Sequence, residues 1–458
     1  MRQHAVNIAG GGLAGALLAV LLGRRGIPVN VFERRADPRV HAADAGRSIN
    51  LALAARGIRA LERANLMEQV RPVMLPMRGR MIHEPQPNSP PRLLRYGQRA
   101  SEVIYSIGRA ALNRVLIEAA AGLPQVRLHF DTTCTDVDVA NGSLRAVDNR
   151  TGMQRTIEAA AIIATDGAGS AVRSSLARAG RVSVTELPLE HDYKEFHIPP
   201  QHGQYALHAQ ALHVWPRHGF MLIALPNPDR SFTATLFLPH TGRPGFDTLD
   251  SGAAAQELFE REFASAAALI PDLPAQFREH PAGRLGTIHT EPWACGSILL
   301  LGDAAHAIVP FHGQGMNAAF EDCVLLDALL ADDGTHCDWP TIFAGFSAAR
   351  RPDTEAIAQM ALENYSEMRS AVLDARFLRQ KSWALQLERR YPTRFIPRYA
   401  MVMFHPEISY AEALRRGAVQ QQILDALDAQ RAHHGSADSA QLDEAELARA
   451  QQLIAAQL

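Results

Sequence analysis

A short segment, residues 297–322, brings together a carboxylate, a glycine loop and a helix start in an arrangement that suits a polar ligand. It opens with the apolar run Ser297–Leu301, which predicts a buried strand. Asp303 follows closely, and its carboxylate can accept hydrogen bonds from sugar or polyol hydroxyl groups. A helix is expected to begin at Gly315–Asn317, where free backbone N–H groups stabilise a developing negative charge. A reduced flavin ring with its polyol chain has both properties.

A glycine-rich turn near the N-terminus indicates binding of a dinucleotide. The apolar segment Ala5–Ala9 predicts a strand, and the G-x-G-x-x-G pattern of Gly10–Gly15 follows it directly. In this pattern Gly10 permits a tight turn, Gly12 lets the backbone approach a pyrophosphate, and Gly15 lets helix and strand pack closely. Because the pattern lies between a strand and a predicted helix, a purely structural glycine turn is the weaker interpretation.

The residues after this turn complete a βαβ unit. Ala14–Arg24 has the pattern of an amphipathic helix, Gly26 ends it, and Pro28–Phe32 predicts a second strand. Such a unit predicts a parallel sheet with a right-handed crossover. Glu33 closes the second strand 18 residues after Gly15, where a carboxylate binds the adenosine ribose hydroxyls and disfavours a 2′-phosphate. The first segment therefore indicates an adenine dinucleotide.

A second glycine turn, Thr165–Ser170, contains Asp166 and follows the apolar strand Ala160–Ala164. Its glycines again allow the backbone to approach a ligand closely. Taken alone, an ordinary β-turn explains the segment equally well. Its significance comes from its place between the first turn and the segment with Asp303.

The remaining hydrophobic patterns define the order of the chain. Helices are expected near 53–68 and over Gly108–Ala121, and a strand over Gln125–Thr133. A Pro-rich loop at 85–91 separates two β-like stretches, which indicates an excursion from the first domain. From about 175 to 285, β-rich stretches alternate with turns and predict an inserted antiparallel sheet.

We therefore predict an α/β fold with a Rossmann-like FAD-binding domain, an inserted antiparallel β-sheet substrate domain and a C-terminal helical region. The predicted domains are an FAD-binding domain over 1–174 with an excursion at 70–105 towards the substrate site, a substrate domain over 175–290, a return to the FAD-binding domain over 291–340, and a helical region over 341–458.

Composition excludes several classes of function. Lys and Arg total 46 against 48 Asp and Glu, and no long basic run exists, which argues against a nucleic-acid partner. Four scattered cysteines predict neither a metal site nor a disulfide framework, and free thiols suit a reducing cytoplasm. We expect no secretory signal and no membrane segment, since the apolar stretch Leu13–Leu22 is too short to span a bilayer. For the assembly we consider a homodimer.

Together the three glycine segments, in this order and spacing, resemble the FAD-dependent aromatic hydroxylases, the single-component class A flavoprotein monooxygenases. The resemblance covers nearly the whole chain. It implies tightly bound FAD and transiently bound NADPH, since no second G-x-G-x-x-G unit is present. The residues that it assigns to the cofactor are Gly10, Gly12, Leu13, Ala14, Gly15, Glu33, Arg34, Arg47, Arg109, Asp166, Asp303, Gly315, Met316 and Asn317.

A finer resemblance is to the kynurenine 3-monooxygenase family. It rests on GRSINLAL (46–53), MRGRMIH (77–83), HVWPR (213–217), ALPN (224–227), FTATLF (232–237), GDAAHAIVPFHGQGMNAAFEDC (302–323), ENYSEMR (363–369) and FIPRYAMV (395–402). In this resemblance Arg80 binds the substrate carboxylate, because a guanidinium fork pairs bidentately with it. The other implied polar contacts are Tyr96, Asn364 and Tyr399. The implied ring contacts are Leu212, Met221, Ile223, Phe237, Pro310, Phe311 and His312, although sheet residues of this kind are as often ordinary core.

The family implies hydroxylation of L-kynurenine to 3-hydroxy-L-kynurenine with NADPH and O₂, through a flavin C4a-hydroperoxide, in tryptophan degradation and NAD biosynthesis. An aniline ring needs no deprotonation, so no catalytic acid or base is assigned. Three alternatives stay open. The first is another class A hydroxylase, which would act on a phenolic acid, another aromatic acid or a quinolone. The second is a flavoprotein reductase or dehydrogenase that does not oxygenate. The third is a flavin-binding sensor or assembly protein without turnover.

Overall fold

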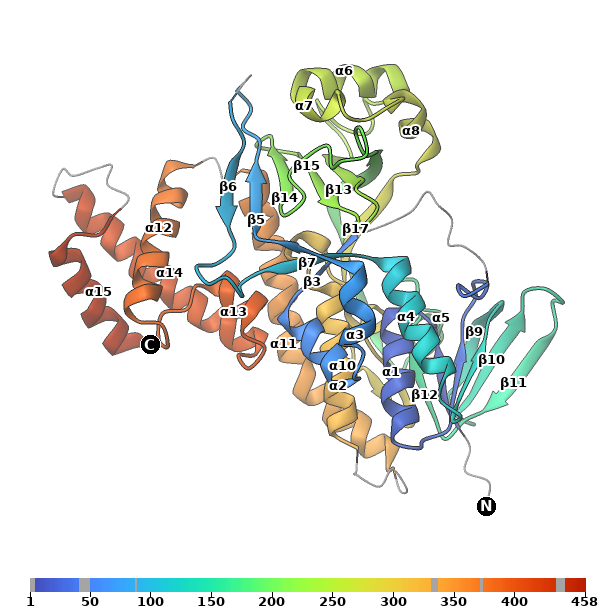
Figure 1. Cartoon of the computed structure of the whole chain (residues 1–458). Helices are drawn as coiled ribbons and strands as arrows, with labels where there is room; N and C mark the ends of the chain where they lie inside the picture. The colour runs from blue at the N-terminus through green and yellow to red at the C-terminus, as the bar shows by residue number, and fades with distance from the viewer. Residues whose placement is uncertain (1–4, 41–49, 87–88, 331–336, 371–373, 434–440) are drawn as a thin grey trace. The chain divides into compact units, whose positions relative to one another are not determined.

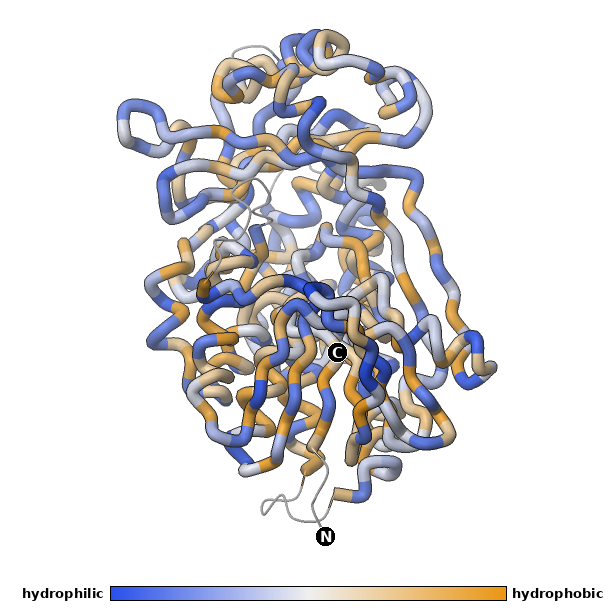
Figure 2. Tube along the Cα trace, turned by 90° about the vertical axis from the view of Figure 1, so that its right-hand side faces the viewer, coloured by the Kyte–Doolittle hydropathy of each residue, from blue (hydrophilic) through white to orange (hydrophobic). Residues whose placement is uncertain are grey.

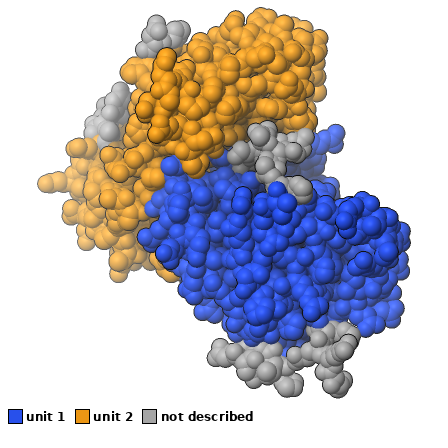
Figure 3. Space-filling model, turned by 45° about the vertical axis from the view of Figure 1, so that its right-hand side comes forward, with its two compact units in different colours: residues 1–75, 105–190, 284–354 blue, residues 76–104, 191–283, 355–458 orange. Residues whose placement is uncertain are grey.

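The computed structural model describes residues 5–40, 50–86, 89–330, 337–370, 374–433 and 441–458. The chain forms two compact units, coloured separately in Figure 3. Unit 1 comprises Met1–Leu75, Tyr105–Glu190 and Arg284–Thr354, and unit 2 comprises Pro76–Ile104, His191–Gly283 and Glu355–Leu458. In Figure 2 the hydrophobic residues run through strands and helices, and hydrophilic residues mark many of the turns.

Unit 1 is built around a six-stranded sheet with the order β18-β19-β12-β1-β2-β8. Its strands are β1 (Val6–Ala9), β2 (Val29–Phe32), β8 (Val126–His129), β12 (Ala161–Ala164), β18 (Ala294–Cys295) and β19 (Ile298–Leu300). All of the described pairings are parallel except that of β18 with β19. The central strands β1, β12 and β19 are fully buried, which explains their continuous apolar sequences.

Helices cover this sheet, and smaller elements complete unit 1 (Figure 1). Helix α1 packs against α4 and α10, and α10 also packs against α2. A separate antiparallel meander, β11-β10-β9, packs against α5. The bounds are α1 (Leu13–Arg24), α2 (Ala55–Arg63), α3 (Met67–Val70), η1 (Arg71–Val73), α4 (Arg109–Ala121), α5 (Ala171–Arg178), α9 (Asp303–His306), η2 (Pro310–His312), α10 (Gly315–Ala328), β3 (Asn50–Leu53), β4 (Met74–Met77), β7 (Ile104–Gly108), β9 (Thr132–Asp138), β10 (Ser143–Asp148) and β11 (Gln154–Glu158).

A seven-stranded sheet has the order β17-β13-β16-β15-β14-β5-β6, and its strands β16, β15, β14, β5 and β6 belong to unit 2, whereas residues 183–190 of β13 and 284–291 of β17 belong to unit 1. Its strands are β5 (Gly79–Ile82), β6 (Arg92–Arg95), β13 (Ser183–Ile198), β14 (Leu212–Pro216), β15 (Met221–Pro226), β16 (Phe232–Pro239) and β17 (Gly283–Glu291). The sheet is mixed, because β5 pairs in parallel with β14 while β6, β15 and β16 pair antiparallel with their neighbours. The predicted excursion therefore contributes an antiparallel hairpin to this sheet.

One face of this sheet is covered by α6 (Gly252–Glu262), α7 (Ala264–Ala267) and α8 (Leu273–Glu279). Buried aromatic and aliphatic side chains of the sheet and of these helices form one core there, including Trp215, Phe232 and Phe259. The remaining helices of the chain are α11 (Trp339–Arg369), α12 (Ala375–Arg390), α13 (Arg398–Phe404), α14 (Tyr410–His433) and α15 (Glu444–Gln457). Among the described residues, no helix is long and apolar enough to span a membrane.

The α/β prediction is confirmed, and some of its elements need correction. The expected strand Gln125–Thr133 is two strands, since Asp131 adopts φ 50° and turns the chain between β8 and β9. The expected helix 53–68 is likewise broken, at Asn65 with φ 47°. The sheet region also contains α6, α7 and α8, which the β-rich pattern did not predict. The structure divides the chain differently from the predicted domains, because residues 175–190, 284–290 and 341–354 lie in unit 1.

Candidate functional site

The three predicted glycine segments meet at the carboxyl-terminal ends of the strands in the unit 1 sheet. Strands β1, β12 and β19 are neighbours and run parallel, so their carboxyl ends lie together. The Gly10, Asp166 and Asp303 turns each follow one of these ends. The Thr165 hydroxyl donates to the carbonyl oxygens of Ala9 (3.1 Å) and Gly10 (2.8 Å), which ties the second turn to the first. Ligands of open parallel sheets bind beyond such strand ends.

Within the first turn, two glycines are required by packing and one faces open space. Gly10 has φ +101°, and a Cβ there would lie 2.6 Å from the Thr165 carbonyl oxygen. A Cβ on Gly15 would lie 2.0 Å from the Gly10 oxygen. Gly12, which begins α1, has no atom within 4 Å of an added Cβ. The open position at the helix start fits the approach of a pyrophosphate.

Glu33 is fixed at the end of β2. Its Oε2 accepts the Gly11 N–H at 2.8 Å, and its Oε1 accepts the Arg35 N–H at 3.0 Å. These bonds hold the carboxylate beside the turn, with lone pairs left for ribose hydroxyls. Arg34 next to it is exposed. Asn113 of α4, which the sequence did not indicate, donates to the Gly11 carbonyl oxygen at 3.0 Å.

Asp166 accepts a backbone N–H of the first turn of α5 with one oxygen and leaves its other oxygen without a partner in the described part of the chain. Its Oδ2 accepts the Ala171 N–H at 2.8 Å. Its Oδ1 is buried and has no hydrogen-bond partner among the described residues. Burial raises the pKa of this carboxyl. Because a buried polar atom without a partner is costly, the free oxygen points to a ligand group that would donate to it.

A buried arginine that sequence reasoning missed links the second and third turns. Arg173 donates from Nη1 to the Ala304 carbonyl oxygen at 3.0 Å, and from Nη2 to that of Ala168. Its side chain is 5% exposed. Arginine follows the second glycine turn in the sequence, but the pattern alone did not distinguish this residue from a surface arginine.

The segment with Asp303 is held from behind by a buried ionic network. The Asp322 carboxylate, fully buried on α10, accepts the Gly302 N–H (3.2 Å), the His306 Nε2 (2.7 Å) and the Arg350 Nε (2.7 Å). Burial opposes its charge, yet His306 and Arg350 hold the pKa of Asp322 below its usual range. Asp303 itself is half-buried at the start of α9. The network therefore fixes the loop that presents Asp303.

The start of α10 lies where the sequence predicted it. Gly315 and Met316 are half-buried in its first turn, where backbone N–H groups have no helical partner. The Asn317 side chain is structural, because its Oδ1 accepts the Ala54 N–H and its Nδ2 donates to the Ala52 and Gly313 oxygens. Only its backbone is available to a cofactor.

The other predicted cofactor residues lie around the first turn or outside the described part. Leu13 is buried and Ala14 half-buried in the first turn of α1. Arg109 is exposed at the start of α4. Arg47 lies outside the described residues. The open Gly12 position, the Glu33 carboxylate and the free Asp166 oxygen together fit an FAD-sized dinucleotide.

A second cluster, in unit 2, gathers around a buried cation. Arg80 on β5 is 4% exposed and donates from Nη1 to Glu367 Oε1 (2.9 Å) and from Nη2 to Asn364 Oδ1 (3.2 Å). Its guanidinium lies 5.0 Å from the Tyr399 ring centroid. Its Nε–H is buried without a partner in the described part of the chain. Arg80 therefore keeps an unused donor inside a polar cluster.

Two tyrosines complete this cluster. The Tyr96 and Tyr399 rings are stacked with centroids 5.6 Å apart. Burial raises the pKa of both hydroxyls, against the opposing effect of Arg80. Both phenols are therefore neutral near pH 7 and can donate hydrogen bonds to an anion. The structure thus brings together the four predicted polar residues Arg80, Tyr96, Asn364 and Tyr399.

The predicted apolar residues of unit 2 lie on the same sheet face as Arg80. The register pairs Arg80 with Leu212, Met221 with Phe237, and Val214 with Ile223, so alternation puts these side chains on one face. The opposite face carries Trp215 and the α6–α8 core. Leu212 and Ile223 are half-buried, while Met221 and Phe237 are nearly fully buried.

The last three predicted ring contacts belong to unit 1. Pro310, Phe311 and His312 form η2, in which Pro310 is exposed and the other two are buried. Their backbone leads into Gly313, which adopts φ +65°.

Two charged residues of the unit 2 cluster were not predicted. Glu367 pairs with Arg80. Burial lowers the pKa of Lys381 of α12, and the charge of Glu367 opposes this effect. Glu367 lies within the ENYSEMR segment, three residues after Asn364 and hence on the same side of α11. That spacing is the signal that could have identified it.

Comparisons with known proteins agree with this architecture. A family described as "FAD binding domain" matches residues 3–361. The chain is 48% identical over 444 residues to a protein named kynurenine 3-monooxygenase from Xanthomonas campestris pv. campestris, covering 96% of this chain and 94% of that protein. It is 47% identical over 426 residues to one from Stenotrophomonas maltophilia, covering 92% of each. A tetrameric 2-methyl-3-hydroxypyridine-5-carboxylic acid oxygenase structure, 19% identical, superposes with TM-score 0.65 over 82% of this chain and 95% of its own.

Proposed function

We propose that this chain, which belongs to the kynurenine 3-monooxygenase family of proteins with an FAD binding domain, hydroxylates L-kynurenine to 3-hydroxy-L-kynurenine. Its family membership makes it an FAD-dependent aromatic monooxygenase. NADPH and O₂ are the proposed co-substrates, and tryptophan degradation leading to NAD biosynthesis is the proposed context. The observation that carries the substrate proposal is the buried Arg80 cluster, because it offers a cation, an anion and two neutral phenols to an amino acid head group.

When bound, FAD supplies the redox chemistry, accepting a hydride from NADPH and activating O₂ for transfer to the ring. The chain's own groups would hold the cofactor: Gly12 and the start of α1 would bind the pyrophosphate, Glu33 the adenosine ribose and Asp303 the ribityl hydroxyls. The N–H groups at the start of α10 would stabilise a negative charge on the flavin ring. The remaining predicted cofactor residues stay part of this proposal.

The Arg80 cluster suits an α-amino acid because it holds both signs of charge. A substrate carboxylate would take up the free Nε–H of Arg80 and hydrogen bonds from the Tyr96 and Tyr399 hydroxyls. The ammonium group would then replace Arg80 as the partner of Glu367. Exchange of one ion pair for two avoids leaving a buried charge uncompensated, which would cost about 3–5 kcal/mol. Asn364 keeps Arg80 oriented during this exchange.

The aromatic ring requires orientation and a dry environment. The amino group makes the ring electron-rich, so attack on activated oxygen needs no proton transfer from the ring beforehand. Leu212, Met221, Ile223 and Phe237 offer an apolar surface on the Arg80 side of the sheet. Burial of the ring against such a surface excludes water, which limits loss of the activated oxygen as peroxide.

Substrate-dependent turnover tests this proposal. The purified protein should have the absorbance spectrum of bound FAD, and kynurenine should stimulate NADPH oxidation with formation of 3-hydroxykynurenine. A panel of phenolic acids, other aromatic acids and quinolones addresses the alternative hydroxylases. If a phenolic acid gives coupled product and kynurenine gives none, the substrate proposal is wrong. NADPH oxidation that yields no hydroxylated product from any compound would favour a reductase, and absence of NADPH oxidation would favour a sensor.

The four cysteines are free thiols, which supports a cytoplasmic location as a further proposal. A homodimer stays a prediction that size-exclusion chromatography with light scattering can test.

A further inference from the structure

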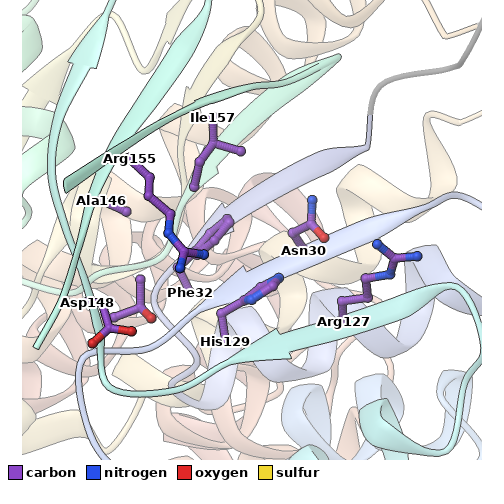
Figure 4. A pocket seen from close by; sticks show the side chains of 9 residues that line it. Asn30, Phe32, Arg127, His129, Ala146, Asp148, Arg155 and Ile157 are labelled. Carbon is purple, nitrogen blue, oxygen red and sulfur yellow. The ribbon is translucent and has the colours of Figure 1, made fainter. Parts of the chain in front are cut away.

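Unit 1 contains a pocket that neither the flavin turns nor the Arg80 cluster uses. Its volume is about 230 Å³, and it lies between the β2–β8 edge of the six-stranded sheet and the meander β9–β11 (Figure 4). Asn30, Phe32, Arg127 and His129 line it from the sheet, and Asp148 and Arg155 from the meander. Small-molecule pockets usually enclose about 300–1,000 Å³, so this one suits a smaller ligand than a dinucleotide.

Strand register explains why these side chains converge. Asn30 pairs with Arg127 and Phe32 with His129 across the parallel β2–β8 ladder, so the four project from one face. Val126 is on the opposite face, where a Cβ on Gly23 of α1 would lie 2.7 Å from its Cγ2. The pocket is therefore on the sheet face turned away from α1, the helix that begins at Gly12.

The floor of the pocket is rigid. The Phe32 and His129 rings are stacked, with centroids 4.8 Å apart and planes 12° apart. The Asn30 amide donates to the Oδ1 of the fully buried Asn7 at 3.0 Å. Asn7 in turn donates to the Glu158 carbonyl oxygen at 3.3 Å. These contacts fix the polar and aromatic groups before any ligand binds, which reduces the entropy cost of binding.

Two arginines give the pocket a positive charge that the chain leaves uncompensated. Neither Arg127 nor Arg155 forms an ion pair or hydrogen bond with any residue that the structure describes, whereas Arg145 and Arg178 nearby both pair with Asp136. Burial is the main cause that lowers the pKa of His129, and the positive charges of Arg127 and Arg155 lower it further. Both guanidinium groups therefore lie close enough to act on the same ring, and an anion bound beside that ring would be attracted by both.

Asp148 does not neutralise these arginines. Its Oδ1 accepts the backbone N–H groups of Arg150 and Thr151 in its own turn. No ion pair joins it to Arg127 or Arg155 within the described ranges. Both arginines, which are exposed, are thus available to an external oxyanion.

We propose that this pocket binds a small oxyanion, the carboxylate or phosphate group of a small metabolite, between Arg127 and Arg155 above the Phe32–His129 floor. Planar guanidinium forks suit both groups because they can donate two parallel hydrogen bonds to adjacent oxygens. The site is separate from the flavin cradle and from the substrate cluster, so the proposal does not depend on which aromatic compound is hydroxylated.

Calorimetric titration of the FAD-loaded enzyme with inorganic phosphate and with succinate tests this site at low ionic strength. We expect saturable binding of at least one probe to the wild type, and binding about tenfold weaker in the double variant Arg127→Gln/Arg155→Gln. Arg150→Gln removes an exposed arginine of the same meander outside the pocket lining and should change the affinity by no more than about twofold. Comparison of phosphate with succinate identifies the oxyanion class.

Three results of the affinity measurements would overturn the proposal. They are no saturable binding of either probe to the wild type, equal binding by the wild type and the double variant, and a loss in Arg150→Gln as large as in the double variant. Binding to the FAD-free protein that disappears once FAD is loaded would also overturn it, since the pocket would then belong to the flavin site. Thermal unfolding of each variant establishes that a lost affinity does not reflect a lost fold.

Discussion

At the scale of single residues, Arg80 carries the most specific information about the substrate. A buried guanidinium is retained only where partners compensate it, and here Glu367 and Asn364 do so. The adjoining phenols lack charge but can donate hydrogen bonds. A ligand that brings both a carboxylate and an ammonium group is the natural match for this set.

Replacing Arg80 by Met should abolish productive substrate binding and leave FAD bound. Loss of charge-assisted hydrogen bonds to the carboxylate should raise the KM for kynurenine about 100-fold, equivalent to about 3 kcal/mol. Steady-state NADPH oxidation measures the change, and flavin absorbance checks cofactor content. Arg78→Met, two residues away and exposed, is the matched control. Kynurenine-stimulated NADPH oxidation at the wild-type level in Arg80→Met would contradict the assignment.

A buried histidine pair on the opposite face of the same sheet should make stability depend on pH. His83 Nε2 lies 2.9 Å from His213 Nδ1, and His83 stacks on Trp215. Burial lowers the pKa of His83 to about 3, with His213 and Arg217 as further causes. Burial also lowers the pKa of His213 to about 4. Because these native pKa values lie below those of the unfolded chain, unfolding takes up protons, and stability falls as the pH decreases from about 6.5 towards 4.

The free energy of unfolding should fall by about 2 kcal/mol per histidine of this pair when the pH is lowered from about 6.5 to about 5. Urea unfolding across this range measures the slope. The variant His83→Phe, which retains a ring beside Trp215, should have a shallower pH dependence than the wild type. Identical slopes in the two proteins would show that the pair does not control acid stability.

The residues of the Arg80 cluster illustrate how far the sequence could reach. Arg80, Tyr96, Asn364 and Tyr399 were implied by family resemblance, and the fold brings them together from β5, the residue after β6, α11 and α13. No local pattern connects segments so distant in the chain. Glu367 was missed because an exposed-looking glutamate in a helix is usually a solvated residue.

At the scale of elements, the β1–α1 turn separates structural glycines from a ligand-facing one. Replacing Gly12 by Ala should leave the FAD-free protein as stable as the wild type, because an added Cβ meets no protein atom within 4 Å. The methyl group should instead hinder the pyrophosphate and weaken FAD binding by about tenfold or more. Fluorescence titration of FAD-free protein measures the affinity, and thermal unfolding measures the stability.

Gly15→Ala is the matched control for this turn. Its Cβ would lie 2.0 Å from the Gly10 oxygen, so this variant should lose stability before any cofactor is added. The interpretation of Gly12 would be wrong if Gly12→Ala bound FAD with the wild-type affinity.

The element that presents Asp303 should depend on the network behind it. Asp322→Asn removes the fully buried carboxylate charge that Arg350 faces at 2.7 Å, and among the described acidic residues it leaves this buried guanidinium only its less buried partners Glu321 and Asp353. We expect a loss of about 3–5 kcal/mol in the free energy of unfolding. Asp353→Asn removes a more exposed partner of Arg350, 3.4 Å away, and should cost less than about 1 kcal/mol. Equal losses in urea unfolding would show that Asp322 has no special role.

Secondary structure was predictable where local patterns are strong. The β1–α1–β2 unit and the start of α10 follow from glycine placement and apolar runs, and the structure contains them within a residue or two. The break between β8 and β9 depends on Asp131 in a left-handed conformation, which a run of strand-forming residues conceals. The parallel pairing of β5 with β14 depends on contacts between distant segments, and these leave no periodic signal in either strand.

At the scale of the whole molecule, the two units carry different parts of the chemistry. The residues proposed to bind FAD, Gly12, Glu33 and Asp303, belong to unit 1. The residues proposed to bind the head group of the amino acid substrate belong to unit 2. Helix α11 contributes to both units. Its Arg350, before the unit boundary, bonds Asp322 behind the Asp303 loop, and its Asn364, after the boundary, bonds Arg80. If both assignments hold, we expect hydroxylation to require residues of both units.

Oxygen labelling of the product tests the central claim most directly. The purified FAD-loaded protein is supplied with kynurenine, NADPH and ¹⁸O₂, and the product is analysed by mass spectrometry with an authentic 3-hydroxykynurenine standard. Our account predicts that the product co-elutes with this standard and carries one ¹⁸O atom. NADPH consumption with only peroxide and unlabelled kynurenine recovered would contradict it.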